Sequence, residues 1–223
     1  MSTNPKIVIA VPTYDSMKPE FVTSLLKLSK YQDTIVSVIS QSLVYVARNN
    51  LFSKAIDYNA DYVLWLDSDM VFPSNTLEVL LEDARQGMDY ISGLYFSRIP
   101  PINPVISKKL IYEQTKDGLK HGSETYKDYP KDSVFEIAGS GFGCVLTNVH
   151  SVAEMVVEYD EPPFLPMKGF GEDYSFCYKF SKMGKKMYCD SRIKCGHVGS
   201  IIYDEQFYLK RLEDEKKWLM ILK

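Results

Sequence analysis

Two kinds of apolar spacing alternate along the first half of the chain. Continuous apolar or β-branched runs, which are typical of buried strands, occur at residues 6–11, 34–39, 62–66 and 90–96. Between these runs, apolar residues recur at helical spacing in residues 19–31, 43–56 and 75–87. Strands that alternate with helices predict an α/β fold with a mixed, mostly parallel central sheet flanked by helices.

Two of the predicted helices carry specific expectations. The helix at 43–56 is expected to bury one apolar face, formed by Leu43, Ala47, Leu51 and Ala55, with Phe52 and Ile56 beside it. Asn75 and Glu78 have the spacing of a capping box, and Gly87 can end the helix that they begin.

The second half of the chain has a different pattern. Residues 97–133 hold Pro100, Pro101 and Pro104 and then an Asp117-Gly118 turn signal, which predicts an excursion with a hairpin and no second domain. Further on, the pattern predicts strands at 134–138 and 144–147, a Pro/Gly loop at 161–171, and helices at 173–183 and 203–222. The whole chain, 1–223, is therefore expected to form one domain. The charged helix 203–222 is expected to pack on its own domain, and pairing with a second subunit in a homo-oligomer is the alternative.

Composition narrows the class of protein. Of the 223 residues, 45% are hydrophobic and 25% are charged, as in ordinary globular proteins. The formal net charge of −3 argues against stable nucleic-acid binding, because such proteins usually carry a basic excess. No run approaches the ~20 apolar residues of a membrane helix, and the N-terminus lacks a secretory signal, so a cytoplasmic location is expected.

The four cysteines show no CxxC pair and are expected to be free thiols in a reducing compartment. A zinc site can be drawn from Cys177, Cys189, Cys195 and His197. Its spacing fits no standard zinc pattern, so the free-thiol interpretation is preferred.

The sharpest chemical feature is Asp67-Ser68-Asp69, directly after the apolar run YVLWL. In an extended chain, side chains two residues apart point the same way, so Asp67 and Asp69 are expected to face one point. Two converging carboxylates suit Mg²⁺ or Mn²⁺. The alternative is a solvated turn after a strand, since Asp and Ser are common turn residues.

Four further segments, spread over most of the chain, carry residues that can act together with the two aspartates. They are the VPTYD turn after the first strand, Ala47-Arg48-Asn49 on the helix before YVLWL, Gly171-Glu172-Asp173 at a helix start, and Gly196-His197 near the end. Their order resembles a GT-A fold glycosyltransferase of the family 2 type. The resemblance covers residues 6–200.

The resemblance implies a metal-dependent transfer of a sugar from a nucleotide diphosphate donor, with a UDP-sugar expected, to an acceptor hydroxyl. The acceptor class stays open among a glycan, a lipid-linked sugar, a protein and a modified base. By resemblance, Mn²⁺ or Mg²⁺ is bound by Asp67, Asp69 and His197. The donor nucleotide would be bound by Pro12, Thr13, Asp15, Arg48, Asp67 and Ser68.

The resemblance also makes Asp173 the general base of an inverting reaction, with Glu172 orienting the site. The helix start stabilises the Asp173 anion and lowers its basicity, so burial or Glu172 must offset this effect. Phe164 and Phe170 in the loop before it suit packing on sugar rings, and anchoring in the core is the alternative.

Other interpretations of these residues stay open. Thr13 and Asp15 can cap a helix, Arg48 can extend to the surface, and His197 can be a loop histidine. The GSGFG segment at 139–143 is not a dinucleotide fingerprint, and its small residues let backbone approach a substrate. For the whole protein, the alternatives are a sugar nucleotidyltransferase and a non-catalytic carbohydrate- or nucleotide-binding module.

Overall fold

A seven-stranded sheet forms the centre of the computed structural model, which describes residues 4–116, 118–199 and 205. The strand order is β2-β1-β3-β10-β5-β11-β8. Five strands run in one direction, and β10 and β8 run against their neighbours. The strands are β1 (Ile7–Pro12), β2 (Thr34–Ile39), β3 (Tyr62–Leu66), β5 (Tyr90–Leu94), β8 (Val134–Ile137), β10 (Cys144–Asn148) and β11 (Met187–Lys194).

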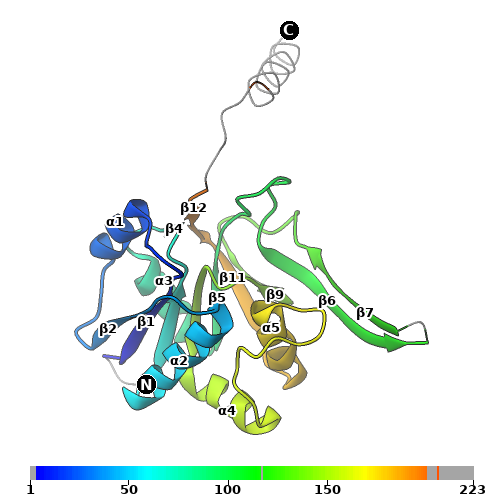
Figure 1. Cartoon of the computed structure of the whole chain (residues 1–223). Helices are drawn as coiled ribbons and strands as arrows, with labels where there is room; N and C mark the ends of the chain where they lie inside the picture. Colours follow the sequence, from blue (N-terminus) through cyan, green and yellow to red (C-terminus); the bar gives the residue numbers. More distant parts are fainter. Residues whose placement is uncertain (1–3, 117, 200–204, 206–223) are drawn as a thin grey trace.

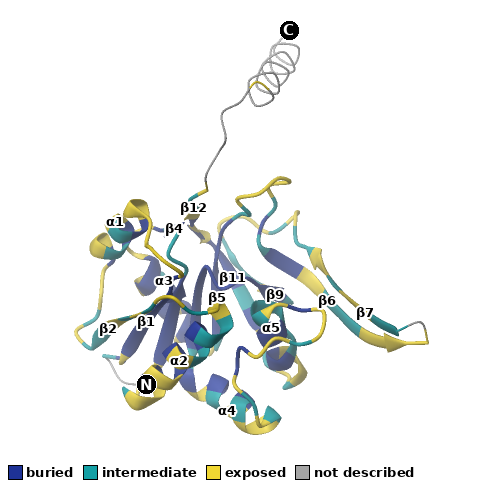
Figure 2. Cartoon of the chain, in the orientation of Figure 1, coloured by how far each residue is buried: buried dark blue, intermediate teal, exposed yellow. Residues whose placement is uncertain are grey.

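Helices cover both faces of this sheet. Helices α1 (Pro19–Lys27) and α3 (Thr76–Ala84) pack on one face, and α2 (Val44–Asp57), α4 (Val149–Tyr159) and α5 (Glu172–Lys182) pack on the other. Strands β1, β3 and β5 are dark blue in Figure 2 because they are buried along their whole length. This three-layer arrangement explains the continuous apolar runs of the sequence, since a strand covered on both faces needs no polar side.

The core on the α2 side is rich in aromatic rings. Trp65 is fully buried and lies edge-on to Phe142 and Phe164, with ring centroids 6.0 and 4.8 Å away. Its indole N–H donates to Thr147 Oγ1 over 2.9 Å, so its polar atom is satisfied inside the core.

The excursion after β5 contains the predicted hairpin. Strands β6 (Ile106–Thr115) and β7 (Gly118–Thr125) form a ribbon that extends away from the central sheet (Figure 1). Gly118 has φ 117°, a conformation that favours glycine. The short strand β9 (Gly139–Ser140) pairs with the base of β6 and so ties the GSGFG segment to the ribbon.

Some expectations from the sequence are wrong. Leu43 and Ile56 are 63% and 43% exposed, so the buried face of α2 is narrower than the apolar spacing suggests. Helix α3 begins after Asn75, but the Asn75 side chain makes no capping hydrogen bond. Helix α4 lies in a segment where no helix was predicted. The predicted helix at 203–222 lies outside the described residues, apart from residue 205.

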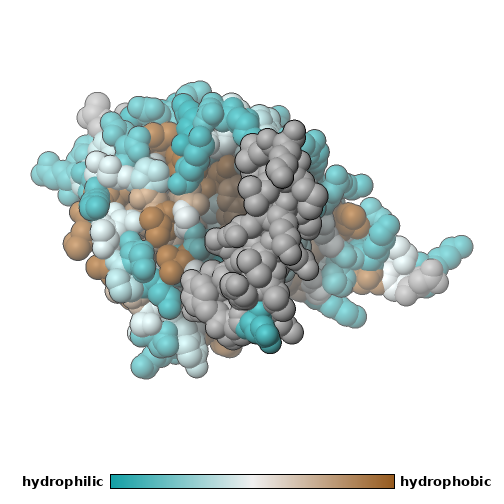
Figure 3. Space-filling view, turned by 90° about the horizontal axis from the view of Figure 1, so that it is seen from above, coloured by the Kyte–Doolittle hydropathy of each residue, from teal (hydrophilic) through white to brown (hydrophobic). Residues whose placement is uncertain are grey.

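Seen from above in Figure 3, hydrophilic side chains surround scattered apolar patches. Among the described residues, no helix combines the length and apolar character needed to cross a membrane.

Candidate active site

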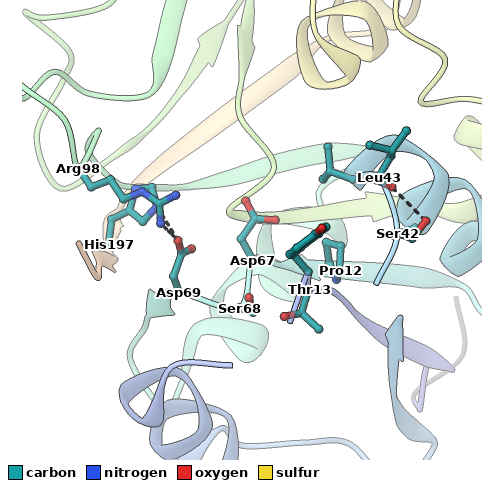
Figure 4. Close-up of a pocket in the computed structure, with 12 residues that line it drawn as sticks. Pro12, Thr13, Ser42, Leu43, Asp67, Ser68, Asp69, Arg98 and His197 are labelled. Atoms are coloured by element: carbon teal, nitrogen blue, oxygen red, sulfur yellow. Dashed lines mark hydrogen bonds and ion pairs between the residues drawn. The ribbon is translucent and has the colours of Figure 1, made fainter. Parts of the chain in front are cut away.

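Most of the predicted site residues gather where β1, β3 and β5 end. Pro12 and Thr13 follow β1, and the Thr13 N–H donates to Ile39 O at the end of β2. A pocket of about 400 Å³ opens here. It is lined by Pro12, Thr13, Tyr14, Ser42, Leu43, Val44, Ala47, Asp67, Ser68, Asp69, Arg98 and His197 (Figure 4). This is where ligands bind in open α/β sheets, at the carboxyl ends of parallel strands.

The Asp67-Ser68-Asp69 segment is a turn and not an extended strand. Met70 N donates to Asp67 O over 3.1 Å, which closes a four-residue turn. Alternation along an extended strand predicts that the two carboxylates face one point. Because the segment is a turn, they point in different directions. Asp67 lies toward Arg48 and Asp69 lies toward Arg98 and His197.

Asp69 and His197 are brought together by a small separate sheet. Strands β4 (Met70–Val71) and β12 (Gly196–His197) pair in antiparallel fashion, and Val198 N donates to Asp69 O over 2.8 Å. His197 Nε2 lies 3.4 Å from Asp69 Oδ2. Two short strands thus connect residues that are far apart in the sequence.

The hydrogen bonds of His197 define its tautomer. Its Nδ1 lies 3.0 Å from Phe96 O, and a carbonyl oxygen can only accept, so Nδ1 carries the proton. In the neutral ring, Nε2 therefore presents a lone pair toward Asp69. The hydrogen bond to Asp69 raises the pKa of His197 despite partial burial. Burial opposes a low pKa at Asp69, but His197 and Arg98 outweigh it and lower the pKa of this carboxyl.

These donors fit a hard divalent cation only in part. Asp69 and His197 offer an oxygen and a nitrogen at one point, and Mg²⁺ often uses one or two protein ligands with substrate phosphates completing its shell. Arg98 already places a positive group on Asp69 Oδ2, so the carboxylate does attract a cation. Within the described ranges, no group of three or more His, Cys, Asp or Glu side chains is arranged to hold a metal. Asp67 lies toward Arg48 and apart from the Asp69–His197 pair, and the metal set of Asp67, Asp69 and His197 stays a prediction.

Arg48 does not extend to the surface; it is absent from the lining of this first pocket but borders a second, neighbouring pocket. Its side chain is 3% exposed and lies against the rings of Phe142 and Phe164. One nitrogen donates to Asp67 Oδ1 over 2.8 Å, and another donates to Glu172 Oε1. Burial alone would lower the pKa of Arg48, but the neighbouring carboxylates raise it. Arg48 thus connects β3 to the start of α5 through one buried cation.

Glu172 and Asp173 open α5 and line a second pocket of about 370 Å³. This pocket shares Val44, Asp67, Arg98 and His197 with the first. Burial and the charge of Glu172 raise the pKa of Asp173 to about 6, although Arg48 opposes the shift. Burial therefore outweighs the effect of the helix start, which alone would lower the pKa. A carboxyl group with this pKa is suited to accept a proton near neutral pH.

Several predicted residues lie away from these pockets. Asp15 is exposed, lines neither pocket, and accepts a hydrogen bond from Ser16 Oγ. Neither it nor Thr13 caps α1, whose start lacks a side-chain cap. Phe164 and Phe170 are only 0% and 8% exposed, so they anchor the loop in the core and cannot pack on a sugar.

The cysteines drawn as a zinc site are buried free thiols. Among the described residues, none of them belongs to a group of three or more potential metal ligands.

Two site residues have no motif that predicts them. Arg98 lines both pockets, and it sits in the excursion after β5. Tyr95 is buried, and its hydroxyl accepts a hydrogen bond from Gly143 N over 3.1 Å. Gly143 O in turn accepts from Asp67 N, so Tyr95 supports the turn that carries the two aspartates.

Comparison with known protein families shows the family to which the chain belongs. The sequence profile of the family described as "Glycosyl transferase family 2" matches residues 14–143, more than half of the chain. The chain belongs to glycosyl transferase family 2. The match includes Arg48 and the two aspartates, whereas Asp173 and His197 lie beyond it.

Solved structures place this family 2 chain among proteins of the same fold. The crystal structure of A197 from STIV matches with a TM-score of 0.64 and 19% identity, over 87% of this chain and 86% of A197. The crystal structure of GalNAc-T7 with UDP, GalNAc and Mn²⁺ matches with a TM-score of 0.57 and 13% identity. That match covers 90% of this chain and 45% of GalNAc-T7. No curated protein matches the sequence.

The GT-A fold and the family expected from the sequence are thereby confirmed. Glycosyl transfer is the activity that this family membership supports.

Proposed function

We propose that this family 2 chain is a metal-dependent glycosyltransferase that moves a sugar from a UDP-sugar to an acceptor hydroxyl with inversion. The observation that carries the proposal is the joining of two pockets. Asp69 and His197 border one, and Asp173, with a pKa of about 6, borders the other. Asp67 and Arg98 lie where the pockets meet.

The first pocket is the proposed donor site. Pro12 and Thr13 present the end of β1 to it, and Ser68 presents the turn after β3. Tyr14 and Leu43 are 75% and 63% exposed at its edge, and a planar base can pack against such apolar surfaces. The GalNAc-T7 structure was solved with UDP and Mn²⁺, which supports a uridine nucleotide and a divalent cation for this fold.

Mn²⁺ or Mg²⁺ at Asp69 and His197 would neutralise the charge that develops on the leaving diphosphate. Asp67 is directed by Arg48 and lies nearer the middle of the combined site. We assign it to the donor and not to the primary metal pair.

The second pocket is the proposed acceptor site. Ile99 and Val105, which are not buried, give it apolar surface beside Glu172 and Asp173. Sugar rings have apolar faces and polar edges, so a glycan or another glycosylated acceptor suits this lining. Asp173 would accept the proton of the acceptor hydroxyl as its oxygen attacks C1 of the donor sugar. Besides burial, the charge of Glu172 raises the pKa of this carboxyl and the charge of Arg48 lowers it.

The test is donor turnover by the Asp173→Asn variant. Removal of a general base costs ~10²–10⁴-fold in rate, so the variant is expected to transfer sugar at least ~100-fold more slowly. UDP and Mn²⁺ affinities should stay within about two-fold of the wild type, because Asp173 does not line the donor pocket. Asn preserves the size of the side chain, so folding is expected to be intact.

A panel of UDP-hexoses and UDP-N-acetylhexosamines, with the product anomer determined, identifies the donor and the stereochemistry. Retention of configuration, or a normal rate in Asp173→Asn, would contradict the assigned base. Pyrophosphate release from a nucleoside triphosphate and a sugar phosphate would instead identify a nucleotidyltransferase. UDP-sugar binding without turnover would identify a binding module.

A further inference from the structure

Arg98 occupies the carboxylate that the divalent cation would use. Its guanidinium donates to Asp69 Oδ2, and His197 Nε2 lies 3.4 Å from the same oxygen. A guanidinium and a divalent cation carry like charges, so they repel each other when both are close to one carboxylate. Arg98 and the metal therefore compete for Asp69.

The main chain around Arg98 is held firmly. Ser97 N donates to Asn103 O over 2.9 Å, and Asn103 N donates to Ser97 Oγ over 3.1 Å. On the opposite side, a Cβ added to Gly199 would lie 3.1 Å from Arg98 Cβ. The backbone thus stays in place, and exchange of partners requires only rotation of the side chain.

The Arg98 side chain has an alternative direction available. It is 46% exposed and borders both the donor and the acceptor pockets. An arginine that leaves Asp69 can therefore reach an anion in the donor pocket. The guanidinium fork matches phosphate oxygens in geometry as well as in charge.

We propose that Arg98 is an internal counter-ion, which neutralises Asp69 when no divalent cation is bound and moves to the donor diphosphate when the metal and nucleotide enter. This inference rests on the proposed function, since it takes the metal and diphosphate sites from it. The exchange makes metal binding weak without nucleotide, and it makes metal and nucleotide bind cooperatively.

The decisive measurement is a titration of the full chain with Mn²⁺, in which the electron paramagnetic resonance signal reports the concentration of free Mn²⁺. Arg98→Gln removes the competing charge and is expected to bind Mn²⁺ alone about three- to ten-fold more tightly than the wild type. Arg98→Lys keeps the charge and should stay closer to the wild type. Arg85→Gln, on an exposed arginine away from both pockets, is the matched control and should change nothing.

A second titration repeats the measurement with saturating UDP. The Kd of UDP in Mn²⁺ should rise about ten-fold in Arg98→Gln, because the diphosphate loses a charged partner. The ratio of Mn²⁺ affinities with and without UDP should therefore fall. Asp69→Asn, in the wild-type and Arg98→Gln backgrounds, shows whether Mn²⁺ binds at Asp69.

The outcomes separate the two ideas. Unchanged or weaker Mn²⁺ affinity in Arg98→Gln, with binding still lost in Asp69→Asn, overturns the counter-ion and leaves the metal site intact. Unchanged UDP affinity in Arg98→Gln overturns the transfer to the diphosphate. Mn²⁺ binding that ignores Asp69→Asn contradicts the metal site itself, and the counter-ion with it.

Discussion

Replacement of Arg48 by methionine is the most informative single perturbation of the site. The residue is buried and pairs with Asp67 and Glu172, which are 33% and 17% exposed. Its Nε has no hydrogen-bond partner, so the two carboxylates account for its side-chain bonding. Methionine fills a similar volume without charge, and the variant therefore leaves two carboxylates in a partly buried place without their cation.

The expected cost follows from this burial. Breaking a buried ion pair typically costs ~3–5 kcal/mol, and the partial exposure of Asp67 places Arg48→Met at the lower end, about 3 kcal/mol. For a chain of this length each kcal/mol lowers Tm by ~2–4 °C, so a decrease of about 6–12 °C is expected at pH 8. The loss should shrink as the pH falls, because protonation of the unpaired carboxylates removes their repulsion.

Urea denaturation of both proteins between pH 5 and pH 8 measures this difference directly. Lys179→Met is the matched control, since Lys179 is also 3% exposed and pairs with Glu161 at 2.9 Å but lines neither pocket. It should also lose stability, but without a change in UDP binding. Arg48→Met with wild-type stability at pH 8 would refute the idea that one buried cation holds β3 and α5 together.

Three further predictions concern the reaction. The pKa of about 6 at Asp173 predicts that log kcat/KM rises with pH up to about 6 and then levels, because only the ionised carboxyl accepts a proton; a limb near pH 4 would contradict the effect of burial. His197→Ala should weaken Mn²⁺ binding and regain part of its activity in excess Mn²⁺, and an unchanged metal dependence would make His197 a loop histidine. Gly141→Ala would place a Cβ 2.3 Å from Tyr95 Oη, so it should displace this ring and lower kcat at least ~10-fold; a normal kcat would show that the Tyr95 contact is dispensable.

The strands and most helices follow from the sequence because their signals are local. Burial of β1 and β3 on both faces demands apolar residues at every position, and this pattern is visible without a structure. The exposure of a side chain is harder to predict from the sequence, because it depends on contacts with distant parts of the chain. Leu43 belongs to the apolar spacing of α2, but it lies at the edge of a pocket, where an apolar side chain can serve a ligand.

The partners within the site are the part that the sequence cannot supply. Arg48 and Glu172 are 124 positions apart, and they form an ion pair because α2 and α5 lie on the same face of the sheet. The two aspartates after β3 were expected to converge because an extended chain was assumed. The turn closed by Met70 N sends them to different cations instead. Arg98 lacks any spacing signal, since its role depends on a loop that returns to β4.

Strand β10 has a consequence for how the chain can be divided. It enters the sheet late in the sequence, yet it lies between β3 and β5, which do not contact each other as neighbours. A fragment that stops after β5 would therefore lack β10, the strand that joins β5 to β3. It would also lack the Gly143 carbonyl that accepts a hydrogen bond from Asp67 N. The early strands and helices are not an autonomous nucleotide-binding half. We expect such a fragment to remain unfolded until residues 139–148 are supplied, even as a separate peptide, since that segment closes the gap in the middle of the sheet.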